Sequence, residues 1–270
     1  MCIRDRNKYA LLINLVVFSY QLNANEISGT SGDVIAVKTD EVKEDYLSYR
    51  HDQSEYLILG LPYVYQTSLK RIKDIDVEVQ YKNFGESRIT IKDLSKVDLN
   101  QKDRKRANAE ALLIRAAIQS YDNTISPSFN FKNPVIGIIS SRYGKKRYIN
   151  EKPRSPHLAL DIAANLGVAV SAPLKGRVIL TGNFFYTGNT IFLDHGFGLI
   201  SSYSHLDSSI VKEGKMIQQG ELIGTVGETG RVTGPHLHWT VYLNKEKINP
   251  EILLKDNFLQ NLFEASQDIL

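Results

Sequence analysis

Alternating apolar and polar positions mark the first half of the chain as β-rich. Ile75, Val77 and Val79 alternate with charged and amide residues, and residues 88–92 (RITIK) repeat this period of two. A period of two is typical of strands with one buried face. Residues 83–85 (NFG) favour a turn, so we expect a hairpin here.

Residues 25–95 are therefore expected to form a small antiparallel β domain. This stretch contains no group of residues that suggests chemistry. Its one histidine, His51, is flanked by Arg50 and Asp52 and is expected in a solvated loop.

The period changes after residue 96. Ala107, Ala111, Ile114 and Ile118 fall on one helical face, which predicts a helix between residues 100 and 121 inside a helical linker at residues 96–128. A basic run at residues 102–106 (KDRKR) crowds its first turns. Such a run can grip an anionic polymer, but a solvated helix face is the commoner explanation.

Glycine turns and short strands dominate residues 129–250, which predicts an all-β domain built of hairpins. Asn249-Pro250 then favours the start of a helix over residues 251–270, with Leu253, Leu254, Leu262 and Phe263 available for packing. The fold class is thus mainly β.

The N-terminus has the pattern of an export signal. Lys8 precedes an apolar run at residues 9–20 (YALLINLVVFSY), which is shorter than a membrane span. The small residue Ala24 favours cleavage of a signal peptide at residues 1–24. A retained anchor and a buried helix are the alternatives, but we expect no stable membrane insertion after cleavage.

Composition narrows the classes further. Of 270 residues 42% are hydrophobic and 23% are charged, which argues against wholesale disorder and against a multi-span membrane protein. The net charge of +3 is too small to indicate a nucleic-acid partner. The only cysteine is Cys2, so the sequence has no disulfide framework and no cysteine zinc site.

The histidines carry the candidate chemistry. In residues 235–243 (PHLHWTVYL), Leu237 and Trp239 belong to one strand face, whereas His236 and His238 share the other. Two imidazoles side by side on a strand face suit a metal site or an acid/base site better than they suit a core.

A second pair lies upstream. His157 and Asp161 are four residues apart, and an imidazole and a carboxylate within one bend are a natural half-site for zinc. His205 falls on the strand face of Ser201 and Tyr203. His195, beside Gly196, is expected to be structural. The sequence lacks an HExxH motif, a P-loop and a nucleophile elbow.

Taken together, these motifs resemble the lysostaphin/LytM-type zinc endopeptidases. The resemblance rests on His157-x-x-x-Asp161, on residues 203–206 (YSHL) and on residues 234–238 (GPHLH), in that order. The region ahead of them is similar in layout to exported peptidoglycan endopeptidases of Gram-negative bacteria.

The resemblance implies a LytM-type peptidase domain at residues 129–250 with an open groove. It implies one Zn²⁺ per chain, held by His157, Asp161 and His238, with a fourth position left for water. His205 and His236 would be the catalytic residues. They would take a proton from the zinc-bound water and stabilise the oxyanion of the tetrahedral intermediate. Arg142, Arg154 and Tyr203 are candidates for lining the groove.

The function implied is an exported, zinc-dependent endopeptidase of the periplasm or cell envelope that cuts peptide bonds of peptidoglycan, its expected partner. The alternative is a non-catalytic wall-binding protein or amidase activator of the same type, which normally lacks some of the five site residues. Residues 25–95 would bind the wall, dock a regulatory partner or cover the groove. If they cover it, residues 129–270 alone should cleave faster.

Overall fold

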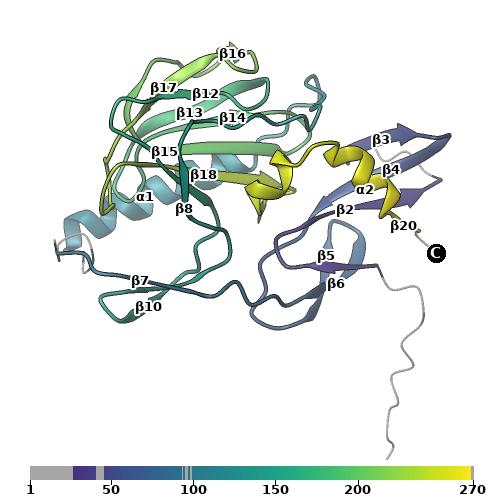
Figure 1. Cartoon of the computed structure of the whole chain (residues 1–270), viewed down its shortest axis with the longest axis horizontal. Coiled ribbons are helices and arrows are strands. Elements are labelled where there is room, and N and C mark those ends of the chain that lie inside the picture. Colours follow the sequence, from purple (N-terminus) through teal and green to yellow (C-terminus); the bar gives the residue numbers. More distant parts are fainter. Residues whose placement is uncertain (1–26, 41–45, 93, 95–96, 98, 269–270) are drawn as a thin grey trace, which may run out of the picture.

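The computed structural model describes residues 27–40, 46–92, 94, 97 and 99–268 (Figure 1). The signal peptide predicted at residues 1–24 lies outside the described residues. Within the described part of the chain, no helix combines the length and the apolar character needed to cross a membrane.

One large antiparallel sheet dominates the C-terminal half, and the expected mainly β class is confirmed. Its central order is β16-β13-β14-β15-β18-β11-β8, with β12, β17 and β19 paired at its sides. The strands are β8 (Ile138–Ser141), β11 (Leu160–Ala163), β12 (Ala169–Ser171), β13 (Gly176–Phe184), β14 (Gly188–Asp194), β15 (Leu199–Ser209), β16 (Met216–Ile217), β17 (Leu222–Val226), β18 (His236–Leu243) and β19 (Glu246–Ile248).

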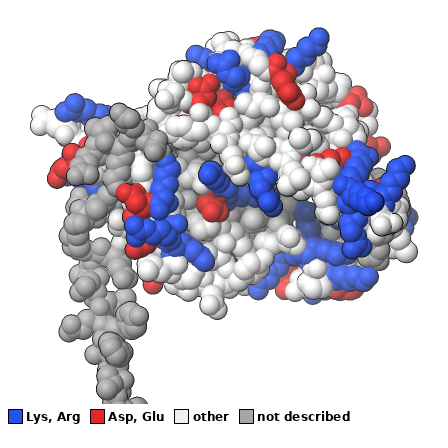
Figure 2. Space-filling view, turned by 180° about the vertical axis from the view of Figure 1, so that it is seen from behind, with Lys and Arg blue, Asp and Glu red and all other residues white. Residues whose placement is uncertain are grey.

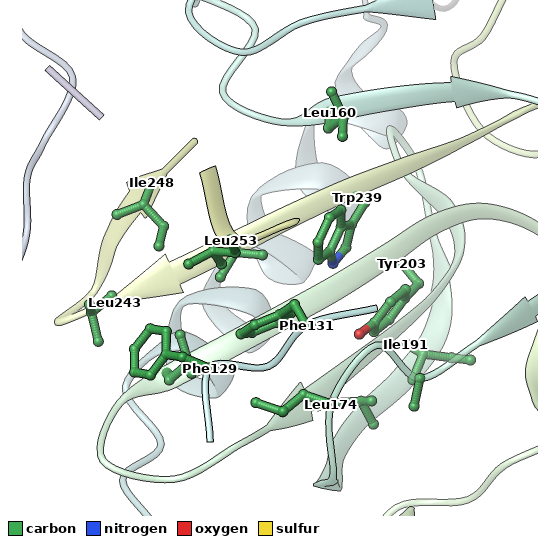
Figure 3. Packing of buried hydrophobic residues seen from close by; sticks show 14 of the residues in the cluster. Phe129, Phe131, Leu160, Leu174, Ile191, Tyr203, Trp239, Leu243, Ile248 and Leu253 are labelled. Carbon is green, nitrogen blue, oxygen red and sulfur yellow. The ribbon is translucent and has the colours of Figure 1, made fainter. Parts of the chain in front are cut away.

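The main core lies on one face of this sheet (Figure 3). Trp239 and Tyr203 are opposite each other in the β15–β18 ladder and are both fully buried. The Tyr203 hydroxyl lies 2.7 Å from Ser201 Oγ inside this core. Tyr203 therefore does not line a groove, and its place among the groove candidates was wrong.

The opposite face of the sheet is covered by α1 (Gln101–Ile118), the helix expected between residues 100 and 121. Asn100 caps it by accepting a hydrogen bond from the Asp103 backbone N–H at 2.9 Å. Ile114 and Ala117 pack there against Phe192, and Tyr242 belongs to the same cluster. The helix is thus part of a second core and not only a connector.

The basic first turns of α1 lie on the surface. Lys102, Arg104 and Lys105 are exposed, and Arg106 pairs with Glu110 at 2.6 Å. The start of α1 is at the left of Figure 1 and comes to the right of Figure 2, where Lys and Arg side chains gather. This is the solvated helix face that the sequence favoured.

The N-terminal half contains two small sheets. One has the order β20-β2-β4-β3 and the other β1-β6-β5. β1 and β6 pair in parallel, as do β2 and β20. The expectation of a purely antiparallel domain was therefore wrong. The strands are β1 (Ser28–Thr30), β2 (Val34–Thr39), β3 (Ser48–His51), β4 (Ser54–Gly60), β5 (Ser68–Ile72), β6 (Ile75–Gln80) and β20 (Gln267–Asp268).

The β2–β4 pair is buried on both faces. Val37 and Leu57 pack toward β5 and β6, whereas Ala36 and Ile58 belong to the core of the large sheet. Both halves of the chain therefore contribute to the main core.

The hairpin expected over residues 75–92 is wrong. β7 (Glu86–Ile89) leaves β6 and pairs in parallel with β9 (Lys146–Ile149), which forms a hairpin with β10 (Lys152–Arg154). Between β6 and β7 the Phe84 ring packs edge-on against Tyr143, with ring centres 5.5 Å apart. A Cβ on Gly144 would lie 2.2 Å from the Phe84 ring, so this docking needs a glycine there.

The C-terminal stretch is not one helix. Asn249 caps the 3₁₀ helix η2 (Pro250–Leu254), and α2 (Phe258–Glu264) begins after Asn257, whose left-handed backbone (φ 55°) interrupts the path. Phe263 of α2 stacks on His51 with ring centres 4.8 Å apart. His51 thus ends β3 and packs on an aromatic ring, which corrects the expected loop position.

Candidate active site

Strand β18 presents its two histidines on one face, as the alternation of its residues predicts. Leu237 and Trp239 are fully buried in the main core, whereas His236 and His238 are partly exposed on the other side. This is the face that α1 covers farther along the strand, so the two imidazoles lie where the helix leaves the sheet uncovered.

Asp161 lies beside His238 because β11 pairs with β18 in a register that sets these two residues opposite each other. Asp161 Oδ1 is 2.7 Å from His238 Nδ1 and 3.0 Å from His157 Nε2. His157 Nε2 and His238 Nδ1 are 3.3 Å apart. The three side chains therefore converge on one point.

His157 is held by the backbone ahead of β11. Its N–H donates to the Lys145 carbonyl and its own carbonyl accepts from Gly144. Its Nδ1 lies 3.1 Å from the Arg142 carbonyl, so that nitrogen carries the proton and leaves the Nε2 lone pair toward Asp161. Arg142 thus acts through its backbone. Its guanidinium instead pairs with Glu251 on the surface.

His205 reaches the site through a β-bulge. Asn189 and Ile191 of β14 oppose Leu206 and Tyr203 of β15, so β15 carries one extra residue between them. His205 there has a left-handed backbone, with φ at 64°. Simple alternation assigns His205 to the core face of Tyr203. The bulge turns it to the other face and gives its core position to Leu206.

The rings of His205 and His236 then lie 4.9 Å apart, centre to centre, and His205 is 5.6 Å from His238. His205 Nδ1 donates to the Thr229 carbonyl at 2.9 Å, and His236 Nδ1 donates to the Gly234 carbonyl at 2.9 Å. Both rings therefore keep Nε2 for chemistry, and His236 Nε2 is 3.9 Å from Asp161 Oδ1.

The electrostatics keep Asp161 ionised and two histidines neutral. Burial alone would raise the pKa of Asp161, but the adjoining His238 and His157 lower it far below its usual range. Burial lowers the pKa of His238 to about 4. Burial, with the neighbouring His238 and His236, lowers the pKa of His205 to about 3.

The donor set suits a divalent transition metal. His157, Asp161 and His238 each offer one ligand atom, and these atoms lie within 4.8 Å of one another. Two neutral imidazoles and one carboxylate are typical zinc ligands. His205, His236 and His238 form a second such group that shares His238. Only the first group contains a carboxylate, that of Asp161. Its negative charge makes this group the better binding site for a divalent cation.

His195 lies apart from this site, in the core. Its Nδ1 is 2.8 Å from the Lys175 carbonyl and its Nε2 is 2.7 Å from Ser201 Oγ. Burial lowers its pKa to about 4, so it remains neutral.

A cavity of ≈ 200 Å³ adjoins the histidines, and sequence reasoning missed most of its walls. Ile89 and Ile91 come from the N-terminal half and Arg147 from β9, and none of them has a spacing that relates it to the histidines. Thr229, whose carbonyl orients His205, has no such spacing either. The other lining residues are Ile149, Tyr186, Thr187, Arg231, Val232 and Thr233.

Comparison with known proteins agrees with the fold. Residues 155–250 match the profile of peptidase family M23. A Pseudomonas aeruginosa protein whose crystal structure was assigned to peptidase M23 is 30% identical. The match covers 83% of this chain and 94% of that one, with a TM-score of 0.66.

Two curated relatives match over shorter stretches. The peptidoglycan DD-endopeptidase ShyA of Vibrio cholerae is 37% identical over 41% of this chain and 26% of its own length. The DD-carboxypeptidase/endopeptidase Mpg of Neisseria meningitidis is 35% identical over 45% of this chain and 28% of its own length. The chain thus spans about a quarter of the length of these relatives.

The sheet and the matches together are those of a family of mainly β peptidases. The chain belongs to peptidase family M23.

Proposed function

We propose that this protein is an exported, zinc-dependent endopeptidase that hydrolyses peptide cross-links of peptidoglycan. The observation that carries the proposal is the convergence of Asp161, His157 and His238 within 2.7–3.3 Å of one another, next to two further histidines. The relatives named as DD-endopeptidases support the substrate class.

In this proposal His157 Nε2, Asp161 Oδ1 and His238 Nδ1 hold one Zn²⁺ per chain. When bound, zinc supplies Lewis acidity and brings the pKa of a coordinated water to about 7. Asp161, already ionised by its surroundings, binds the cation without first losing a proton, as does His238, which is neutral at pH 7.

His205 and His236 act beside the ligands as catalytic residues. The Thr229 carbonyl fixes the Nδ1 proton of His205, so its Nε2 lone pair accepts a proton from the attacking water. His236 Nε2 is oriented in the same way by Gly234 and stabilises the oxyanion of the tetrahedral intermediate once it carries a proton.

The cellular setting follows from the expected signal at residues 1–24. Export to the periplasm or cell envelope gives the enzyme access to its polymeric substrate. Peptidoglycan is then the partner, and no nucleic acid is involved.

The N-terminal half is proposed to restrict access to the site. Ile89 and Ile91, which line the ≈ 200 Å³ cavity, are the residues through which it would act. Because both halves share a core, Ile91→Ser tests this better than truncation to residues 129–270. Faster digestion of sacculi is expected, and unchanged or slower digestion would leave wall binding or partner docking as the role.

Digestion of purified sacculi by the mature chain tests the proposal. Products are identified by mass spectrometry, zinc is assayed, and His236→Ala is compared with His51→Ala, a histidine far from the site. Loss of cross-linked dimers with the parent and His51→Ala, but not with His236→Ala, is expected. A protein that binds zinc but cuts nothing would instead be a wall-binding protein or an amidase activator.

A further inference from the structure

A second cavity, of ≈ 360 Å³, opens beside the histidines and is lined by positive charge. Arg147, Arg154, Arg231 and Lys247 all contribute to its wall, and no aspartate or glutamate is among the described residues that line it. It shares His157 and His238 with the site described above, so whatever occupies it lies next to the proposed metal ligands.

Arg147 is the central member of this group. It lies on β9, opposite Arg154 of β10 in the hairpin, and it lines both cavities. Its Nε is buried and has no hydrogen-bond partner in the described part of the chain. Burial lowers the pKa of Arg147, and the negative charge of Asp161 offsets only part of this effect. A buried guanidinium N–H without a hydrogen-bond partner costs stability, because its lost hydration is not replaced.

The other arginines are held near it. Arg231 lies over the Tyr186 ring at 4.4 Å, and its N–H donates to the Tyr186 carbonyl. Burial, and then the positive charges of Arg147 and Arg154, lower the pKa of Arg231. Cations that repel one another in a half-buried pocket are stabilised by an anion that all of them reach.

We propose that Arg147, Arg154 and Arg231 form a binding site for a carboxylate of the substrate peptide, next to the bond to be cut. The guanidinium fork matches a carboxylate in two parallel hydrogen bonds. Stem peptides carry such groups, so this site would select strands whose carboxylates are free over strands in which they are amidated. The inference rests on the proposed function for its ligand.

Binding of two matched synthetic stem peptides, one with free and one with amidated carboxylates, tests the inference. The zinc-loaded full chain carrying His236→Ala is titrated by calorimetry so that no turnover interferes. Binding of the free form about tenfold tighter is expected, and this ratio should approach one when Arg147→Gln is added. Arg71→Gln, an exposed arginine that pairs with Asp76, should leave the ratio unchanged.

Thermal unfolding shows whether Arg147 acts by binding the peptide or by stabilising the fold. Because the buried Nε of Arg147 has no hydrogen-bond partner among the described residues, Arg147→Gln should leave the midpoint unchanged or raise it. A lowered midpoint with both peptides weakened equally would make Arg147 a structural residue and overturn the inference. Arg231→Gln serves as the second variant if Arg147→Gln does not fold.

The two proposals fail in different ways. Equal affinity of the parent for both peptides would overturn the carboxylate site, even if the parent digests sacculi. Preference for the free form without digestion would uphold the site and contradict the proposed hydrolysis.

Discussion

Asp161 Oδ1 and His238 Nδ1 lie 2.7 Å apart because the β11–β18 register sets the two residues opposite each other. A backbone ladder thus fixes two of the three proposed ligands, and only His157 depends on a loop. The geometry of such a pair should persist when other residues of the site are changed.

Zinc content is therefore expected to divide the five site residues into two groups. Asp161→Ala, like substitution of His157 or His238, should lower zinc well below one per chain and abolish cleavage. His205→Ala should keep its zinc while kcat falls by about 10²–10⁴, the usual range for a lost general base. Metal analysis and kinetics on the same samples test this, and loss of zinc from His205→Ala would contradict the assignment.

Gly188 is expected to be essential for the position of His205. A Cβ at Gly188 would lie 2.2 Å from Thr229 Oγ1, and the carbonyl of Thr229 holds His205 Nδ1. Gly188→Ala should therefore displace Thr229, lower kcat and destabilise the protein by about 1–3 kcal/mol.

Gly167→Ala is the matched control for that substitution. Gly167 also has a positive φ, of 84°, but no atom of the described residues lies within 4 Å of its Cβ position. Its replacement should cost only the backbone strain of about 1 kcal/mol and leave kcat unchanged. Equal kinetic effects of the two alanines would refute the link to His205.

His195 should make the protein sensitive to mild acid. Burial lowers its pKa from 6.5 to about 4, so the unfolded chain takes up the proton first. The contribution of neutral His195 to the free energy of unfolding is complete above pH 6.5. It is lost as the pH falls toward 4, a change on the order of 3 kcal/mol. Urea unfolding of His195→Gln between pH 4 and 7 should show a shallower loss of stability than the parent, and parallel curves would contradict this.

The mature N-terminus is expected at Asn25. Intact-mass spectrometry of protein from the periplasmic fraction measures it directly, and Ala24→Arg is expected to block processing because cleavage needs a small residue there. A chain that retains residues 1–24 in the membrane fraction would support the anchor instead.

Much of the site was predictable because strand alternation is a local rule. His236 and His238 had to share a face once residues 235–243 formed a strand. His205 is different, since a bulge moves it off the face of Tyr203, and a single left-handed residue leaves no period in the sequence. Only the family resemblance suggested its place.

Other features depend on contacts between distant segments. Arg147 and Arg231 are brought together by a hairpin and a loop, and no spacing relates them. The burial of β2 and β4 on both faces, by contrast, does have a local signal. Strands buried on both faces lose their alternation, and residues 34–37 (VIAV) and 56–59 (YLIL) are continuous apolar runs.

The burial of β2 and β4 on both faces determines how the chain unfolds. Since Val37 faces one hydrophobic interior and Ala36 the other, neither half can melt without exposing apolar surface of its neighbour. The described part of the chain should therefore unfold in one calorimetric transition. A chimera in which the N-terminal half is replaced by that of a relative should not fold stably.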